Sequence, residues 1–321
     1  MLSKPDFLFK NVVLVMTKNK EKLSFKNDNL IIKNDEDKII LQKTCYRIFS
    51  LWIVGPFLIT SGLLERAIKF GFSIVFFSFS FKYINALNVK TEGNVLLRKK
   101  QYESKDWNIG RYLVDNKIKN QTLLLKSLRS KSQSCKDNIV NLEKLNEIEL
   151  FDAKNLHEIM GVEGVASRIF FGEFFTQLNW IGRKPRAKID STNVLMDIGY
   201  TLLFNYIEGM LNLYGFDVYC GFYHRFFYQR KSLVCDMVEP FRCIIDKQIR
   251  KAHNLGQIKA EDFQSYKGKC LLPYKNSKPY LKFLTESILN EKEEIFLYIQ
   301  SFYRAFMNNK PIKEYPIFTI K

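Results

Sequence analysis

The stretch that decides the fold of the second half of the chain runs from residue 190 to residue 215 and reads DSTNVLMDIGYTLLFNYIEGMLNLYG. Its opening Asp-Ser-Thr-Asn favours a helix start, because short polar side chains accept hydrogen bonds from the free N–H groups of a first turn. Glycine adopts the left-handed conformation that ends many helices. The stretch therefore predicts a long helix that begins after Asp190 and ends at Gly215.

Helical periodicity extends to both sides of this stretch. Asn94 to Lys136 is basic with an apolar side, which predicts amphipathic helix and leaves its charge as either a solvated face or a surface that meets DNA. Ile139 to Leu150, Asn155 to Leu178 and the segment from Lys278 onward predict further helices. We expect an all-α domain over residues 93–321.

The first ninety residues follow a different pattern. Short apolar runs alternate with turn-forming Asn, Asp and Lys residues, which predicts hairpins in a sheet or sandwich. The runs are Phe7 to Met16, Lys22 to Phe25, Leu30 to Ile32, Ile39 to Leu41, Cys45 to Val54 and Ser73 to Phe79. Thr60 to Gly71 predicts a short helix closed by glycine. The expected fold class is α+β, with a β-rich domain at residues 1–92 before the larger helical domain.

The charge of the chain indicates its partner. There are 50 Lys and Arg residues against 33 Asp and Glu, a net charge of +17, which favours nucleic acid or an anionic membrane surface. The longest apolar run, Phe49 to Leu64, contains glycine and proline and is shorter than the roughly 20 residues of a spanning helix. The N-terminus shows no signal-peptide pattern. We expect a soluble cytoplasmic protein that binds nucleic acid and no membrane.

The six cysteines form no Cys-x-x-Cys pair, which is typical of structural thiols in a reduced compartment. A zinc site is the weaker alternative, because the available spacings match no usual zinc pattern. Its ligands would be Cys220, His224, Cys235 and Cys243.

Three acids are candidates for chemistry. Glu163 lies between two glycines, whose small size would let another helix approach; the alternative is an ordinary exposed glutamate. Asp236 and Glu239 are three residues apart and share one face of a helix. Pro240 requires that helix to begin just before it or to bend there, so we expect both acids near a helix N-terminus, which also favours phosphate. The alternative is charge complementarity at the helix start.

His224, one of three histidines, precedes a basic and aromatic loop that contains Arg225, Arg230 and Lys231. Such residues contact phosphates and stack on bases, although a structural histidine in a surface loop is the plainer alternative. A second basic loop runs from Arg183 to Lys188. Carboxylates with one imidazole suit a hard divalent cation, and basic surroundings suit a polyanion. The set predicts metal-assisted chemistry on nucleic acid phosphate.

These motifs resemble the CRISPR-associated protein 1 family, the integrase of spacer acquisition. The resemblance covers most of the helical region and is looser over the β-rich region. It rests on GVEGVA at 161–166, the Arg/Pro-rich loop at 183–188, Asn193, Gly199-Tyr200, GFYH at 221–224 and SLVCDMVEPFR at 232–242, with KIKNQ at 117–121 upstream. Cys235 departs from the small or apolar residue that is more usual there.

The resemblance implies that Glu163, His224 and Glu239 hold Mg²⁺ or Mn²⁺ and that Asp236 is a nearby acid important for activity. It implies phosphoryl transfer in which the 3′-OH of a DNA fragment is the nucleophile, with water giving endonuclease activity at the same site. We expect DNA contacts from the basic and aromatic residues of both loops and the nearby helices. They are Arg183, Arg186, Lys188, Tyr200, Arg225, Arg230, Lys231 and Arg242.

The resemblance also implies partners. They are fragment and repeat DNA, a second copy bound through the β-rich domain, and the small CRISPR-associated protein 2, with a CRISPR-associated trimming nuclease as a further candidate. Two other functions remain open from the sequence. One is a catalytically silent basic scaffold for DNA, and the other is a basic RNA-binding protein.

Overall fold

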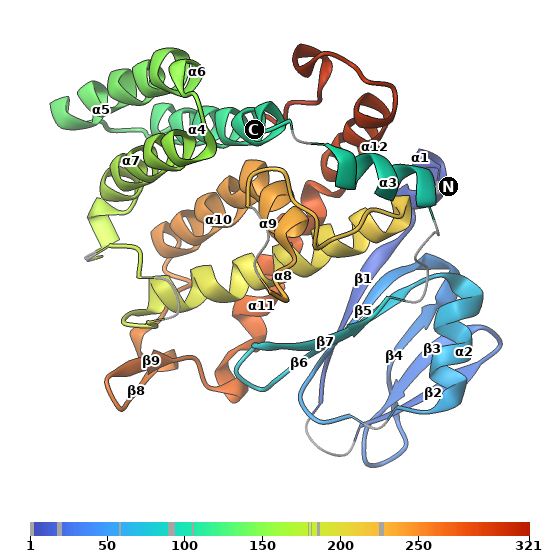
Figure 1. The fold of residues 1–321 in the computed structure, drawn as a ribbon. Coiled ribbons are helices and arrows are strands. Elements are labelled where there is room, and N and C mark those ends of the chain that lie inside the picture. The colour runs from blue at the N-terminus through green and yellow to red at the C-terminus, as the bar shows by residue number, and fades with distance from the viewer. Residues whose placement is uncertain are drawn as a thin grey trace.

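The computed structural model describes residues 3–17, 21–57, 59–88, 94–104, 106–178, 180, 182–184, 187–224 and 228–321. Strands dominate up to residue 88, and helices dominate from residue 94 onward (Figure 1). The expected α+β class is therefore confirmed. The expected boundary between residues 92 and 93 falls in residues 89–93, which lie outside the described residues.

The β-rich region contains two sheets and two helices. Its elements are α1 (Lys4–Leu8), β1 (Asn11–Met16), β2 (Lys22–Lys26), β3 (Asn29–Lys33), β4 (Ile39–Thr44), β5 (Ile48–Val54), α2 (Ser61–Phe70), β6 (Ser73–Phe77) and β7 (Tyr83–Leu87). The order β2-β3-β4 is an antiparallel meander, as the hairpin prediction requires. The other sheet has the order β1-β5-β6-β7.

In that second sheet β6 and β7 pair antiparallel, but the hairpin prediction is wrong for the rest, because β5 pairs in parallel with both β1 and β6. Parallel strands need a crossover connection, and α2 supplies it between β5 and β6. Every residue of β5 is buried, as expected for a parallel strand that is covered on both faces. Gly71 ends α2 at φ +64°, so the predicted glycine stop is confirmed.

The helical region surrounds α8. Its elements are α3 (Val95–Glu103), α4 (Asn108–Lys126), α5 (Gln133–Lys144), α6 (Leu150–Asp152), α7 (Leu156–Phe174), α8 (Ser191–Tyr214), α9 (Ser232–Val238), α10 (Arg242–Asn254), β8 (Gln264–Tyr266), β9 (Lys269–Leu271), α11 (Lys278–Asn290) and α12 (Lys292–Met307). The Asp190 carboxylate caps α8 by accepting from the Asn193 N–H at 2.7 Å, and Gly215 ends it at φ +82°. Both ends of the predicted helix are confirmed.

The two regions share a continuous hydrophobic core. Phe49 of β5 packs edge-on against Tyr206 of α8 with ring centroids 5.4 Å apart, and Phe7 of α1 stacks on Phe296 of α12 at 4.4 Å. At Gly209 of α8 an added Cβ would lie 3.2 Å from the Phe49 ring, so the glycine lets the sheet approach this helix closely. The sheet therefore fixes the position of α8, around which the site is built.

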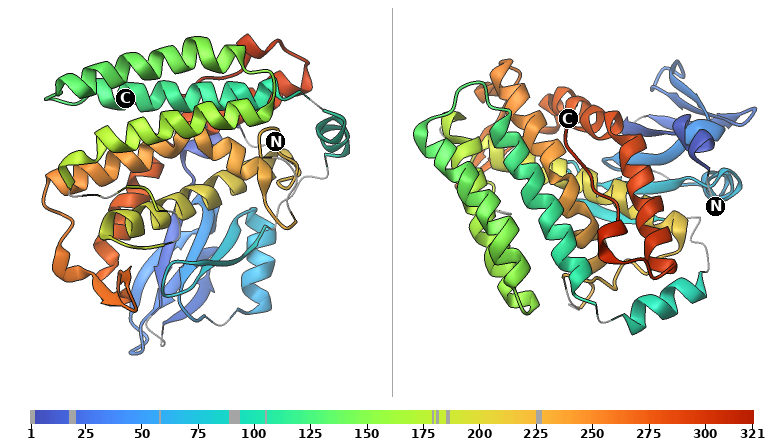
Figure 2. Two further views of the ribbon diagram at one scale, coloured as in Figure 1. Left: turned by 60° about the vertical axis from the view of Figure 1, so that its left-hand side comes forward. Right: turned by 90° about the horizontal axis from the view of Figure 1, so that it is seen from above.

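Two long helices, α4 and α7, lie side by side at the edge of the helical region (Figure 2). Together with the α9–α10 segment they carry the residues of greatest chemical interest. Within the part of the chain that the structure describes, no helix is long and apolar enough to cross a membrane.

Candidate metal and nucleic-acid site

Glu163 lies on the side of α7 that faces α4. Its Oε1 accepts a hydrogen bond from Ser167 Oγ at 2.9 Å and forms an ion pair with the ammonium group of Lys117 on α4. The side chain is 24% exposed. The sequence predicted that the neighbouring glycines let another helix approach. The structure does not bear this out, because an added Cβ at Gly161 or Gly164 would meet no atom within 4 Å. These glycines lie on the open side of α7.

Glu239 is buried in a 3-10 turn, Glu239–Phe241, between α9 and α10. Its Oε2 accepts from Lys117 Nζ at 2.8 Å and from Arg242 Nε at 3.0 Å. Burial alone would raise the pKa of this carboxyl, but the charges of Arg242 and Lys117 outweigh it and lower the pKa to about 2. Glu239 is therefore a stable carboxylate although water hardly reaches it.

The α-helix is interrupted at Pro240, because α9 ends at Val238, a 3-10 turn follows at Glu239–Phe241, and α10 begins at Arg242. The expectation that both acids lie near a helix N-terminus is wrong for Asp236, which lies in the second half of α9. Asp236 and Glu239 also have different partners, because Asp236 binds the loop at 222–224 and Glu239 binds α4.

Asp236 holds His224 in place. The carboxylate is fully buried, and it accepts from the backbone N–H groups of Phe222, Tyr223 and His224 at 2.6, 2.9 and 2.8 Å. Its Oδ1 also lies 2.7 Å from His224 Nδ1. This network assigns the proton to Nδ1 and leaves the lone pair of Nε2 free to bind a ligand.

The loop can pass this close to Asp236 because residue 221 is glycine. An added Cβ there would lie 2.7 Å from Asp236 Oδ2 and 2.8 Å from the His224 carbonyl oxygen. The predicted Gly-x-x-His spacing thus has a physical reason, which is that the glycine allows the backbone to wrap around the carboxylate.

Electrostatic interactions link the three acids and His224. The charges of Glu163, Glu239 and Asp236 all act on the buried Tyr223 hydroxyl, whose pKa is raised first by burial and then by these carboxylates. When it is protonated, His224 also acts electrostatically on the Glu239 carboxyl. The sequence placed these residues on separate segments, and the fold brings them together.

The centre of this cluster is the Lys117 ammonium, which bridges Glu163 and Glu239. Burial acts to lower the pKa of Lys117, but the charges of Glu239 and Glu163 more than offset it, and the pKa is raised. Lys117 therefore carries a permanent positive charge between two carboxylates.

As they stand, no three His, Cys, Asp or Glu side chains among the described residues are gathered closely enough to hold a metal ion. That finding also argues against the zinc alternative at Cys220, His224, Cys235 and Cys243. For a hard divalent ion the donor types fit, since Glu163 and Glu239 supply carboxylates and His224 supplies a free imidazole nitrogen. The bridging ammonium shows that the space between the two carboxylates accepts a cation.

Arginine and tyrosine side chains extend the cluster on the Glu239 side. The guanidinium groups of Arg242 and Arg183 lie 4.7 and 5.5 Å from the centroid of the Tyr200 ring. Tyr200 is 8% exposed and donates to Asp246 Oδ1 at 2.5 Å. The ring is buried, and the predicted DNA contact of Tyr200 stays untested. Its role is to hold Arg242 beside Glu239.

Lys231 is also turned inward. Its ammonium donates to Glu208 Oε1 of α8 at 2.7 Å and to the Tyr83 hydroxyl of β7 at 3.0 Å. The side chain is 16% exposed. The charge of Lys231 is thus paired within the protein, and its DNA contact stays a prediction. The side chain ties the start of α9 to the sheet.

The remaining predicted DNA contacts differ in their surroundings. Arg183 donates to Asp197 Oδ1 at 2.7 Å, Lys188 is partly buried, and Arg230 is exposed. Arg186 and Arg225 lie outside the described residues. For these five side chains and for Arg242, the DNA contact stays a prediction.

Sequence reasoning missed the role of Lys117, which it quoted only as part of the KIKNQ motif. A signal was available in α4, since this helix buries several polar side chains. Asn120 is one of them, and its amide donates to the carbonyl oxygens of Pro240 at 3.1 Å and Phe318 at 2.9 Å. A run of polar residues at apolar positions indicates buried polar contacts, although it does not show with which residues they are made.

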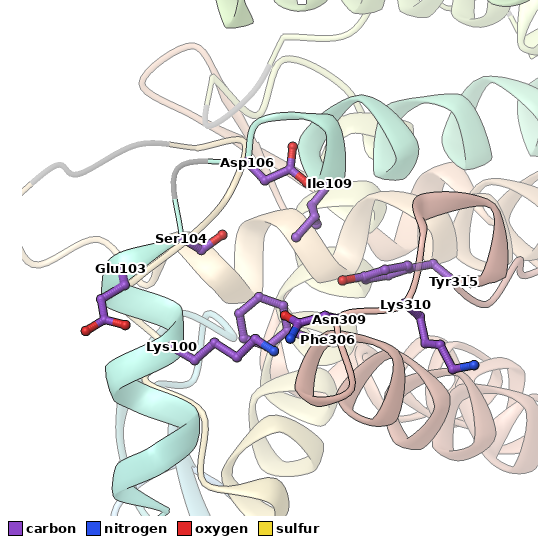
Figure 3. Close-up of a pocket in the computed structure, with 9 residues that line it drawn as sticks. All are labelled: Lys100, Glu103, Ser104, Asp106, Ile109, Phe306, Asn309, Lys310 and Tyr315. Atoms are coloured by element: carbon purple, nitrogen blue, oxygen red, sulfur yellow. The ribbon is translucent and has the colours of Figure 1, made fainter.

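A separate pocket of about 380 Å³ lies between α3 and the segment that follows α12 (Figure 3). Lys100, Phe306 and Tyr315 are among its lining residues. None of the lining residues belongs to the cluster around Lys117. The pocket therefore plays no part in the site.

Together these features define an α+β protein whose helical region carries two carboxylates that share a buried ammonium group, and a histidine oriented by a third acid. Residues 14–286 match the family described as CRISPR associated protein Cas1, and the chain belongs to that family. The resemblance of its motifs is thereby confirmed.

Two curated relatives illustrate the similarity. The chain is 31% identical over 220 residues to CRISPR-associated endonuclease Cas1 1 of Thermodesulfovibrio yellowstonii, which covers 64% of this chain and 69% of the relative. It is 28% identical over 242 residues to CRISPR-associated endonuclease Cas1 2 of Rhodospirillum rubrum, with 70% of each covered.

Solved structures share the fold. A Cas1 protein from Thermotoga maritima superposes with a TM-score of 0.79 at 19% identity, covering 92% of this chain and 97% of the other. A casposase bound to its integration product gives 0.78 at 18% identity, covering 97% and 96%. A chain of a Cas6-RT-Cas1–Cas2 complex gives 0.81 at 21% identity. That match covers 97% of this chain and only 36% of the longer one.

Proposed function

We propose that this protein is a metal-dependent DNA integrase and endonuclease that inserts DNA fragments into a CRISPR repeat array. One observation carries the proposal. Glu163 and Glu239 share the ammonium group of Lys117, Arg242 lies beside Glu239, and Asp236 orients His224. Membership of the Cas1 family supports the proposal, and several curated relatives are named Cas1 endonucleases.

In this proposal Glu163, Glu239 and His224 Nε2 hold Mg²⁺ or Mn²⁺. When bound, such an ion polarises the target phosphate and stabilises the attacking or leaving 3′ oxygen. Asp236 keeps the His224 proton on Nδ1, so that Nε2 stays a neutral donor. Arg242 adds a fixed positive charge next to the reacting phosphate.

The nucleophile comes from the substrate. The 3′-OH of the DNA fragment attacks the repeat phosphate, and the leaving 3′ oxygen departs from the opposite side, so the chain needs no covalent nucleophile of its own. Water in place of the 3′-OH gives endonuclease cleavage. The net charge of +17 makes DNA binding strongly dependent on salt.

The proposal includes partners. Fragment and repeat DNA are the substrates, a second copy binds through the β-rich region, and Cas2 completes the integration complex. A structural neighbour is titled as a complex that contains Cas1 and Cas2, which supports this last partner. A trimming nuclease would prepare the fragment ends.

The decisive experiment is a strand-transfer assay on supercoiled repeat-containing DNA, with and without Mn²⁺ and Cas2. We expect Glu163→Ala and His224→Ala to abolish joining while DNA binding in a gel shift is retained. The matched control is Glu173→Ala, which removes another acid of α7 whose Oε1 binds Ser134 and Asn138 instead. Joining at the wild-type level by either site variant would overturn the assignment.

The same assay separates the alternatives. A silent DNA scaffold would bind DNA without metal-dependent joining or cleavage, whereas an RNA-binding protein would prefer RNA over duplex or branched DNA in competition. The acids and the histidine are all present and in contact with partners that orient them, which favours the enzyme over the scaffold.

A further inference from the structure

Lys117 connects three separate elements of the site. It lies in the middle of α4, and its ammonium binds Glu163 of α7 and Glu239 of the turn before α10. Its side chain is 9% exposed. The proposed function assigns these two carboxylates to the metal and leaves the lysine between them without a role.

The charges explain why the lysine is there. Two carboxylates that share a site repel each other, and a buried ammonium is costly unless it is paired. The two negative charges of Glu163 and Glu239 are balanced by the two positive charges of Lys117 and Arg242, so these four residues are together neutral without metal. Lys117 therefore keeps the two acids close together in the metal-free protein.

A divalent ion between the same carboxylates changes this balance. It would add two positive charges where the ammonium already lies, and like charges a few ångström apart repel strongly in a buried site. The lysine ammonium sits on a flexible four-carbon stem and can move, whereas Ser167 and Arg242 also hold the two carboxylates.

We propose that Lys117 competes with the metal: its ammonium occupies the space between Glu163 and Glu239, and it leaves at least one of them when the divalent ion binds. This inference rests on the proposed function, because it takes both acids as metal ligands. The displaced ammonium needs a new anionic partner, and a DNA phosphate is the anion that the proposed reaction brings to this place. Metal and DNA should consequently bind cooperatively.

The test is a Mn²⁺ titration followed by electron paramagnetic resonance, with and without a short DNA duplex. Lys117→Met removes the competing charge, so we expect it to bind Mn²⁺ about tenfold more tightly than the wild type in the absence of DNA, equivalent to about 1.4 kcal/mol. Adding DNA should tighten Mn²⁺ binding by the wild type more than by this variant.

Two variants serve as controls. Lys126→Met removes a lysine from the same helix whose partner is the surface residue Glu143, and it should bind Mn²⁺ as the wild type does. Lys117→Arg keeps the charge and should show no gain in affinity. If Lys117→Met fails to fold, as judged by circular dichroism, Lys117→Gln takes its place, because its amide still fills the site without a charge.

Equal or weaker Mn²⁺ binding by the uncharged Lys117 variant would overturn the inference, since the lysine would then only position the carboxylates. Glu163→Gln separates this failure from a failure of the proposed function. Undiminished Mn²⁺ binding by Glu163→Gln would show that the metal site itself is wrongly assigned, whatever happens at Lys117.

Discussion

The two halves of the site are built in different ways. On one side Asp236 holds the His224 loop through four short contacts to N–H donors and the ring nitrogen. On the other side Glu163 and Glu239 come from separate helical segments and are joined by the charge of Lys117. The histidine half is thus complete without a cation, whereas the carboxylate half depends on one.

The largest effect is expected when the histidine half is broken at its centre. Asp236→Asn replaces a carboxylate oxygen by an NH₂ group that faces N–H donors, so part of the network is lost and buried donors stay unpaired. We expect strand transfer to fall by about 10- to 100-fold, the range for lost partners of a metal-binding histidine. We also expect the free energy of unfolding to fall by about 1–3 kcal/mol.

Strand-transfer rates and urea unfolding measure these two effects. Asp197→Asn is a suitable comparison, because this partly exposed acid pairs with Arg183. Normal strand transfer by Asp236→Asn would show that the orientation of His224 does not matter.

A smaller loss is expected from Gly221→Ala, which pushes a methyl group against Asp236 and the His224 carbonyl oxygen. Forcing a carbon into such a contact costs about 1–3 kcal/mol and should displace the loop. Gly161→Ala is the matched comparison, because its methyl group would enter open space on α7. It should leave activity intact and stabilise the helix by up to about 1 kcal/mol. Thermal unfolding of both variants measures the two changes in stability. Equal changes for Gly221→Ala and Gly161→Ala would contradict the expected difference.

The pH dependence of stability separates two buried acids. Burial raises the pKa of Asp246 to about 7, although Tyr200 and Arg242 act to lower it, whereas the pKa of Glu239 is lowered to about 2. A raised pKa stabilises the folded state fully below the unfolded pKa, and the gain is lost as pH rises through the folded value. The contribution of Asp246 should therefore disappear between about pH 4 and pH 7, while that of Glu239 is lost only on acidification below about pH 4.5.

Urea unfolding at pH 5 and pH 8 measures the Asp246 effect directly. Compared with the wild type, Asp246→Asn should lose less stability between these pH values, by about 1–3 kcal/mol, since each pKa unit corresponds to about 1.4 kcal/mol. A variant with the same pH dependence as the wild type would show that Asp246 does not titrate in this range.

The sequence predicted features that depend on local chemistry. The structure confirms three such features, which follow from the conformations that the residues favour. They are the cap at Asp190, the stop at Gly215 and the interruption of the helix at Pro240. The spacing of Glu163, His224 and Glu239 became meaningful only through resemblance to a family, because no local rule states which distant segments will meet.

Features that depend on packing could not be predicted in this way. A basic or aromatic residue looks like a DNA contact in the sequence, but Tyr200 and Lys231 prove to be buried against acids on other elements. Parallel pairing of β5 was missed because a short apolar run does not reveal its neighbours. The position of Lys117 between the two carboxylates could not be predicted either, because it depends on how α4 packs against α7 and against the Glu239 turn.

The most direct test of the central claim is a crystal structure of the protein grown with Mn²⁺ and analysed by anomalous diffraction. We predict one strong anomalous peak bound by Glu163, His224 Nε2 and Glu239, with the Lys117 ammonium moved away from at least one carboxylate. A peak at other residues, or no peak at this site while Lys117 still bridges Glu163 and Glu239, would contradict the account.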